Sequence, residues 1–305
     1  MAPSLVASGL KKRYGDVQAL DGFDLSVPSG TIHGLLGPNG AGKSTAVKAL
    51  ATLIDVDGGT AQVAGLDVRT DARRVRERIG LVGQNAAVDE ILGGRQNLVM
   101  FGRLYGLAKS AARARADELL TVFGLAEAAE RSVSTYSGGM RRRLDIAAGL
   151  IRRPAVLFLD EPTAGLDPRA RNEVWQTVRE VAELGTAVLL TTQNLDEADQ
   201  LAGQISVLDH GRVIAAGTPT ELKRQIGGDR VTVALRSAAE MSRLTGRLPE
   251  TGKDGLTATF EVRLTEVVRA LDELGIETDD LVLRRPTLDE VFLTLTGPAT
   301  QGASR

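Results

Sequence analysis

The sequence is organised around one glycine-rich stretch, Gly37-Pro38-Asn39-Gly40-Ala41-Gly42-Lys43-Ser44. It fits the pattern G-x-x-x-x-G-K-[ST], in which backbone N–H groups surround the phosphates of a nucleotide. Glycine tolerates backbone angles that a Cβ forbids, so this stretch can close around an anion. We expect Lys43 to reach the β- and γ-phosphates and the Ser44 hydroxyl to bind Mg²⁺. Thr45, the next residue, completes the predicted phosphate-binding set.

The residues on either side of this stretch support the same interpretation. Residues 31–36 predict a buried strand, and residues 44–53 predict a helix whose N-terminus points at the phosphates. A glycine-rich turn without a ligand is the alternative. The strand before the stretch and the helix after it favour a nucleotide site.

Composition limits the possible classes of protein. The 305 residues suffice for two domains, and 43% hydrophobic content can fill ordinary cores. A net charge of −2 gives no general attraction to nucleic acid, and the arginines of residues 71–78 lack the interleaved aromatic residues of a nucleic-acid surface. Without cysteine the chain has no disulfides or catalytic thiols, which suggests a cytosolic protein.

The sequence contains no predicted membrane segment. Residues 1–10 lack the basic and apolar regions of a signal peptide, and the longest apolar runs, such as residues 187–190, are of strand length. We therefore expect a soluble protein whose only route to a membrane is through a partner, and we expect no nucleic-acid partner.

Two regions before the glycine-rich stretch predict strands, and the first of them carries a further candidate. Residues 5–14 and 17–27 alternate polar and apolar side chains, which predicts antiparallel strands with one solvated face. Tyr14 lies at the end of the first of these strands. An aromatic residue there can stack on an adenine ring, although alone it is more typical of an ordinary half-buried strand position.

A helical subdomain is predicted for residues 90–153, placed between strands of the core. Its second half contains Ser137-Gly138-Gly139. Ser137 is a natural N-cap, and two glycines in a first helical turn cost roughly 1 kcal/mol each. The glycines are explained if an anion approaches the backbone at the start of this helix. As an isolated pattern, S-G-G is a weak signal.

Carboxylates and an amide follow two predicted buried strands. Residues 155–159 are apolar and run into Asp160-Glu161, and residues 186–192 run into Gln193. A carboxylate at the end of a buried strand is costly unless a cation offsets its charge. Mg²⁺ held by Asp160 and Ser44 provides that cation, and Glu161 could then orient or deprotonate a water molecule. The alternative is a pair of solvent-facing acids.

The pattern of strands and helices restarts after Gly227-Gly228-Asp229, which we interpret as a domain boundary. Residues 1–228 form the predicted nucleotide-binding domain, and residues 229–297 form a small α+β domain of three strands and three helices. This second domain has no catalytic constellation, and packing or dimerisation is its expected role. Residues 298–305 are predicted to be a tail.

With these motifs in order, residues 5–225 resemble the ATP-binding subunits of ABC transporters. The residues that carry the resemblance are the adenine-stacking Tyr14, the Walker A stretch Gly37 to Ser44, the Q-loop Gln84, the signature Ser137-Gly138-Gly139, the Walker B Asp160 with catalytic Glu161, and the D-loop Ala164-Gly165-Leu166-Asp167.

This resemblance implies an α/β fold of the P-loop NTPase type. A RecA-like core would carry an antiparallel β subdomain and the inserted helical subdomain, followed by the small α+β C-terminal domain. It also implies a head-to-tail homodimer with two ATP molecules between the Walker A stretch of one copy and the signature of the other. Mg²⁺ would be held by Ser44, Gln84 and Asp160, and Asp167 would lie near the nucleotide.

One position departs from the family pattern. The family usually has histidine at the switch position, where this chain has Gln193. Glutamine can still hydrogen-bond the γ-phosphate, but it cannot carry a positive charge. The predicted catalytic residues are therefore Glu161, Lys43 and Gln193, and hydrolysis is expected to depend more heavily on Glu161.

Residues around Gln193 and the ending 284–293 narrow the resemblance to the daunorubicin/doxorubicin-resistance branch. Membership implies a separate permease of the ABC-2 type and export of drugs, polyketides or lipids. The exported molecule would contact the permease and not this chain. The chain would be cytoplasmic, held at the inner face of the membrane by the permease.

Three functions follow from these observations. The first is an ATP-hydrolysing export subunit, which the complete motif set and the absent membrane span favour. The second is a non-transport ABC protein acting on nucleic acid or ribosomes, which a single cassette without a heptad run or basic tail disfavours. The third is a nucleotide-gated regulatory protein, which Gln193 suggests and Glu161 disfavours.

Overall fold

The computed structural model describes residues 3–225, 230–284 and 286–296. The chain divides into two compact units, Met1–Thr218 and Pro219–Arg305, each with its own hydrophobic core. The boundary predicted at residues 227–229 and the tail predicted at residues 298–305 lie outside the described residues.

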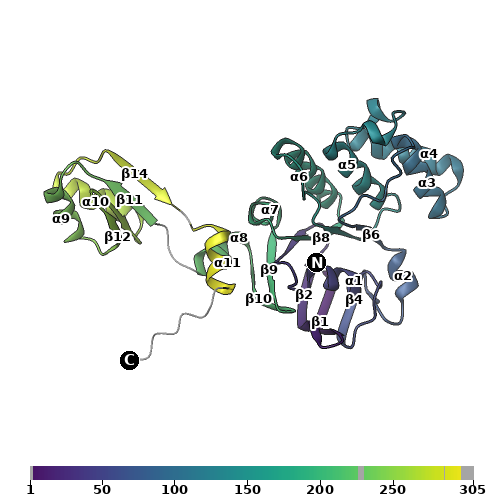
Figure 1. Cartoon of the computed structure of the whole chain (residues 1–305), viewed down its shortest axis with the longest axis horizontal. Coiled ribbons are helices and arrows are strands. Elements are labelled where there is room, and N and C mark those ends of the chain that lie inside the picture. The colour runs from purple at the N-terminus through teal and green to yellow at the C-terminus, as the bar shows by residue number, and fades with distance from the viewer. Residues whose placement is uncertain (1–2, 226–229, 285, 297–305) are drawn as a thin grey trace. The chain divides into compact units, whose positions relative to one another are not determined.

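A six-stranded sheet forms the centre of the first unit (Figure 1), in the order β10-β9-β3-β8-β7-β6. Five of its strands are parallel, and β10 pairs antiparallel with β9 at one edge. The strands are β3 (Ile32–Leu36), β6 (Ile79–Val82), β7 (Val156–Asp160), β8 (Ala187–Thr192), β9 (Gln204–Asp209) and β10 (Arg212–Gly217).

Strand β7 shows why this sheet lies in the middle of the unit. Val156 and Phe158 join the core that packs against the N-terminal strands and first helix, whereas Leu157 and Leu159 join the core under the later helices. All four are fully buried. Because both faces of the strand are apolar, its sequence is a continuous hydrophobic run, as parallel strands covered on both faces require.

A second, four-stranded antiparallel sheet covers one face of the first, in the order β2-β1-β4-β5. The predicted antiparallel pairing of the first two strands is confirmed. Helix α1 ends three residues before its predicted end, where Thr52 takes a left-handed φ of 60°. The elements of this region are β1 (Pro3–Tyr14), β2 (Val17–Pro28), α1 (Lys43–Leu50), β4 (Gly58–Val63), β5 (Leu66–Asp67) and α2 (Ala72–Arg76).

Helices occupy the segment between β6 and β7, as predicted, and cover the other face of the central sheet with the helices that follow. Ser137 caps α5, since its Oγ accepts a hydrogen bond from the Met140 N–H at 3.2 Å. Asp167 caps α6 in the same way through Ala170 N–H at 2.9 Å. These helices are α3 (Gly94–Leu104), α4 (Lys109–Val122), α5 (Gly138–Gly149), α6 (Pro168–Glu183) and α7 (Leu195–Leu201).

The second unit has a four-stranded antiparallel sheet in the order β12-β13-β11-β14. One of these strands, β12 (Glu250–Asp254), is absent from the predicted pattern because all five of its residues are exposed and none is apolar. The other elements are α8 (Pro219–Gln225), β11 (Arg230–Ala234), α9 (Ala238–Thr245), β13 (Thr257–Phe260), α10 (Leu264–Leu274), β14 (Asp280–Arg284) and α11 (Leu288–Thr296).

Within the part of the chain that the structure describes, every helix is too short or too polar to cross a bilayer.

A buried histidine on β3 makes the stability of the folded chain depend on pH. His33 is 6% exposed, and its Nε2 lies 2.9 Å from Ser206 Oγ on β9. Its Nδ1 is buried without a hydrogen-bond partner among the described residues. Burial lowers the pKa of His33 from 6.5 to about 4. The folded protein therefore keeps this ring neutral in a pH range where the unfolded chain protonates it.

We predict that the free energy of unfolding falls as the pH drops from 6.5 towards 4, by up to ~3 kcal/mol from His33 alone. The sign follows because the folded pKa is the lower one, so acid favours the unfolded chain. Chemical denaturation of the parent and of His33→Gln, from pH 7.5 to pH 5.5, measures the difference. Parallel pH profiles for the two proteins would contradict the assignment.

Candidate nucleotide-binding site

The order of the strands brings the candidate residues to one edge of the central sheet. Strands β3, β8, β7 and β6 are adjacent and parallel, so their carboxyl ends lie side by side. The residues that follow these ends are, in the same order, Gly37, Gln193, Glu161 and Gly83. Open parallel sheets bind their ligands at this edge, and the fold therefore gathers motifs that are far apart in the sequence.

The loop from Gly37 to Ser44 packs so closely on its neighbours that side chains are excluded at two of its glycines. A Cβ on Gly37 would lie 2.3 Å from the Leu208 carbonyl oxygen, and one on Gly42 would lie 2.4 Å from that of Ala19. Gly42 also has a φ of 108°. The glycines thus hold the loop against β9 and β2, and Pro38, Asn39, Gly40 and Ala41 form the turn between them.

Lys43 is almost buried under this loop, with 5% of its surface exposed. Its ammonium donates hydrogen bonds to the carbonyl oxygens of Gly37, at 2.6 Å, and Pro38, at 3.0 Å. Burial lowers the pKa of Lys43, while the nearby carboxylates of Glu161 and Asp160 oppose that change. The loop thus holds a partly desolvated cation whose charge an anionic phosphate would complement.

Asp160, the last residue of β7, contacts two hydroxyl groups across the edge of the sheet. Ser44 Oγ lies 3.1 Å from its Oδ2, and Thr191 Oγ1 donates to its Oδ1. A carboxylate and a serine hydroxyl together offer the hard oxygen ligands that Mg²⁺ prefers. In proteins Mg²⁺ usually binds one or two such ligands and keeps several waters or substrate phosphates. Within the described residues there is no cluster of three or more His, Asp or Glu side chains that could hold a metal ion.

Glu161 has an unusual backbone and a central place among the candidates. Its φ of 47° lies in the left-handed region, and its N–H donates to the Thr191 carbonyl oxygen at 3.0 Å. It lines a cavity of about 140 Å³ together with Gln84 and Gly138. It also lines a second cavity, of about 430 Å³, together with Gln193. Glu161 therefore borders two cavities: one lined by the Q-loop and signature residues, and one lined by the switch residue.

The two signature glycines lie in different surroundings, one buried and one exposed. Gly139 is buried, and a Cβ there would lie 2.8 Å from the Ala170 Cβ, so this glycine allows α5 to pack against α6. Helix packing thus gives Gly139 a structural reason of its own, and the prediction that both glycines meet an anion stays a prediction. Ser137 and Gly138 are exposed at the start of α5 and remain candidates to meet a phosphate.

Three further predicted residues lie at the margins of the site. Tyr14 is 46% exposed at the end of β1, with the Lys12 ammonium 5.4 Å from the centre of its ring. Asp167 is exposed and acts as the N-cap of α6. Thr45 lies half-buried in the first turn of α1. Their predicted contacts with a nucleotide stay predictions.

Sequence reasoning missed a set of buried polar residues behind the site. Glu197 on α7 is 1% exposed and accepts hydrogen bonds from Thr163 Oγ1, at 2.6 Å, and from Trp175 Nε1, at 3.2 Å. It thus ties the helix that follows Gln193 to the segment that follows Glu161. In the sequence, Glu197 is an acidic residue four positions before Leu201 in a short helix, which alone does not distinguish it from a surface position.

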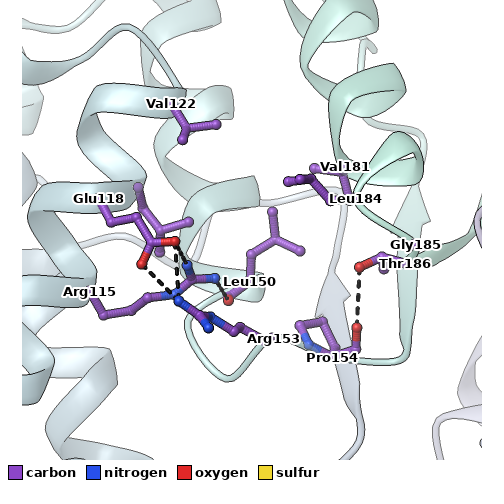
Figure 2. A pocket seen from close by; sticks show the side chains of 11 residues that line it. Arg115, Glu118, Val122, Leu150, Arg153, Pro154, Val181, Leu184, Gly185 and Thr186 are labelled. Carbon is purple, nitrogen blue, oxygen red and sulfur yellow. Dashed lines mark hydrogen bonds and ion pairs between the residues drawn. The ribbon is translucent and has the colours of Figure 1, made fainter.

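Figure 2 shows a cavity of about 460 Å³ elsewhere in the first unit. Pro154 and Thr186, which precede β7 and β8, line it, so it lies towards the opposite edge of the sheet from the phosphate loop. Its charged groups satisfy one another, since Glu118 pairs with both Arg115 and Arg153. The cavity therefore belongs to the packing of α4 against α6 and not to the nucleotide site.

The comparisons with known proteins agree with this geometry. A family profile described as "ABC transporter" matches residues 20–164. A daunorubicin resistance ATP-binding protein from Streptomyces coeruleorubidus is 58% identical over 96% of this chain and 96% of its own length. A daunorubicin/doxorubicin resistance ATP-binding protein from Streptomyces peucetius is 52% identical over 96% and 92%.

This chain belongs to the ABC transporter ATP-binding proteins. Among solved structures, cbiO1 of Clostridium perfringens, part of an ABC transporter complex, matches with a TM-score of 0.68 at 28% identity, over 74% of this chain and 95% of its own. The predicted fold class, family and branch are confirmed. As a member of the family the chain binds nucleotide and is an ATPase.

We predict that Lys43→Ala weakens ATP binding by about 10²-fold, because charge-assisted contacts to the phosphates are lost from a buried position. Titration with a fluorescent ATP analogue measures the change. Lys48→Ala is the matched control, since Lys48 lies exposed on the same helix and should bind as the parent does. Equal affinity for ATP in Lys43→Ala and the parent would contradict the role of the loop.

Proposed function

We propose that this chain is the ATP-hydrolysing subunit of an exporter of drugs, antibiotics, polyketides or lipids. The observation that carries the proposal is the contact of Ser44 and Asp160 beside the buried Lys43, with Glu161 next in the chain. Similarity over nearly the whole chain to daunorubicin resistance ATP-binding proteins supports the class of cargo.

In this proposal Ser44, Asp160 and Gln84 hold Mg²⁺. The hydroxyl and carboxylate already lie within 3.1 Å of each other, and Gln84 lines the same cavity as Glu161. Bound Mg²⁺ supplies positive charge that offsets the charge of the β- and γ-phosphates. The backbone N–H groups of the loop from Gly37 to Ser44, together with Lys43, bind the same phosphates.

Glu161 acts as the general base. Its carboxylate accepts a proton from a water molecule whose oxygen bonds to the γ-phosphorus, while the bond from that phosphorus to the bridging oxygen breaks and ADP leaves. Lys43 stabilises the charge on the transferred group, and Gln193 donates a hydrogen bond to it. Because the amide of Gln193 is not basic, it cannot accept this proton, and Glu161 is the proposed acceptor.

A homodimer completes the site. The N-terminus of α5, with exposed Ser137 and Gly138, has N–H groups and a positive dipole end that suit a phosphate. We place the γ-phosphate bound by the second copy of the chain at this position. Each dimer would then hold two ATP molecules, and Asp167 of the D-loop would lie near the shared interface.

The exporter's membrane part is a separate permease of the ABC-2 type, two copies of which bind the dimer at the inner face of the cell membrane. Residues of the helical segment between β6 and β7 make this contact, and the cargo binds the permease. An alternative is a regulatory protein in which ATP drives dimerisation and hydrolysis matters little. Gln193 suggests that alternative, whereas the constrained Glu161 favours hydrolysis.

We predict that Glu161→Gln binds Mg-ATP as the parent does but turns it over 10²–10⁴-fold more slowly, as expected when a general base is removed. Steady-state phosphate release measures turnover. Glu183→Gln, an exposed carboxylate at the end of α6, is the control and should have parent activity. Undiminished turnover in Glu161→Gln would remove Glu161 from the mechanism and favour the regulatory alternative.

The transport role is tested by purifying tagged Glu161→Gln protein, in mild detergent with Mg-ATP, from the membranes of its host. We expect a polytopic permease to co-purify at about one-to-one stoichiometry and to be released when Mg-ATP is omitted. If only soluble partners are recovered, the proposed role in export is contradicted, whereas the ATPase activity is unaffected by that result.

A further inference from the structure

A buried arginine in α5 binds four acceptors that surround the catalytic edge of the sheet. Arg142 is 7% exposed. Its Nε donates to the Pro162 carbonyl oxygen at 2.7 Å, and its two Nη atoms donate to those of Gly83, at 2.7 Å, and Asp160, at 3.2 Å. Nη1 also lies 3.3 Å from Asp145 Oδ2, in an i,i+3 pair on the same helix.

These acceptors lie beside the residues that the proposed chemistry uses. Asp160 and Pro162 flank Glu161 on both sides, and Gly83 precedes Gln84. One guanidinium therefore links the backbone at the end of β7 to the backbone at the end of β6. Its planar fork can bind several acceptors in fixed directions, which a single ammonium cannot do.

The backbone of Glu161 needs such support. A left-handed conformation is strained for a residue that has a Cβ, and Glu161 has a φ of 47°. Strained residues of this kind persist only where their surroundings hold them. Thr191 binds the Glu161 N–H from β8, and Arg142 binds the carbonyl groups before and after Glu161. The strained residue is held from both sides.

Asp145 extends this connection to the residues that follow Gln84. It is 4% exposed, and its Oδ1 accepts a hydrogen bond from the Ala87 N–H at 2.9 Å. The Arg142–Asp145 pair thus anchors the Q-loop at Gly83 and at Ala87, with Gln84 between the two anchors. A buried ion pair with every group hydrogen-bonded fixes a geometry more than it adds stability.

We propose that Arg142 is a positioning residue for ATP hydrolysis, one that holds the Glu161 backbone in its strained conformation and in register with Gln84. This inference rests on the proposed role of Glu161 as general base. The alternative is that Arg142 only holds α5 against the sheet. In that case its loss lowers stability and nucleotide affinity but does not depend on Glu161.

The test is a double-mutant cycle on the full-length chain, with Arg142→Lys in the parent and in Glu161→Gln. Arg142→Lys keeps the charge opposite Asp145 and removes the fork. We expect kcat for ATP to fall 10–100-fold, the cost of a small displacement of a reacting group, with KM for ATP changed less than about threefold. In the Glu161→Gln background, the same substitution should lower the residual turnover less than twofold.

Arg143→Lys is the matched control, since Arg143 on the same helix donates to Phe123 O and pairs with Glu173, away from Glu161. It should keep the parent kcat. If Arg142→Lys does not fold, Asp145→Asn makes the same test, because it weakens the hold on the guanidinium and leaves the backbone acceptors in place. We expect its kcat to fall at unchanged KM, again only when Glu161 is present.

Three results overturn the inference: parent kcat in Arg142→Lys, an equal loss of turnover with and without Glu161, or a rise in KM without a change in kcat. A failure of the proposed function looks different. In that case Glu161→Gln itself retains full turnover, before any change at Arg142 is made.

Discussion

The rest of this structure depends on the burial of the central sheet on both faces. The interiors of strands β3, β7 and β8 are buried and almost entirely apolar, and burial keeps the one titratable residue among them, His33, neutral. A charged side chain can therefore be accommodated only where a strand ends. Because these strands are parallel, all such positions fall at one edge, and Asp160, Glu161 and Gln193 meet the phosphate loop there. The buried Lys43 then offsets the negative charge that these carboxylates bring together.

Much of this arrangement could be predicted from the sequence, because the phosphate loop, Gln84, the pair Asp160-Glu161 and Gln193 each follow a mostly apolar run of strand length. The glycine-rich stretch, the strand before Asp160 and the cap at Ser137 carry local signals that need no tertiary information. The buried partners could not be predicted in the same way. Arg142 lies in a run of three arginines that is typical of a solvated helix face, and only the packing of α5 shows which of the three is enclosed. Strand β12 was missed because its residues have no apolar alternation.

Helix α5 connects two parts of the site. Its exposed N-terminus, at Ser137 and Gly138, is available to a second copy of the chain, while Gly139 and Arg142 fix the helix to α6 and to the end of β7. A shift of the helix would therefore move the carbonyl groups on either side of Glu161. In this account, the same rigid element that meets the partner's nucleotide also sets the backbone of its own general base. If two copies bind ATP as proposed, α5 would couple that binding to the geometry for hydrolysis.

The measurement that tests the account most directly is the mass of the full-length Glu161→Gln protein by sedimentation velocity, with and without Mg-ATP. We expect a monomer without nucleotide and a dimer with it. We also expect Ser137→Arg in the same background to bind ATP but stay monomeric, because a large cation then blocks the start of α5. A monomer at saturating Mg-ATP, or a dimer that Ser137→Arg leaves intact, would contradict a site that two copies of the chain complete.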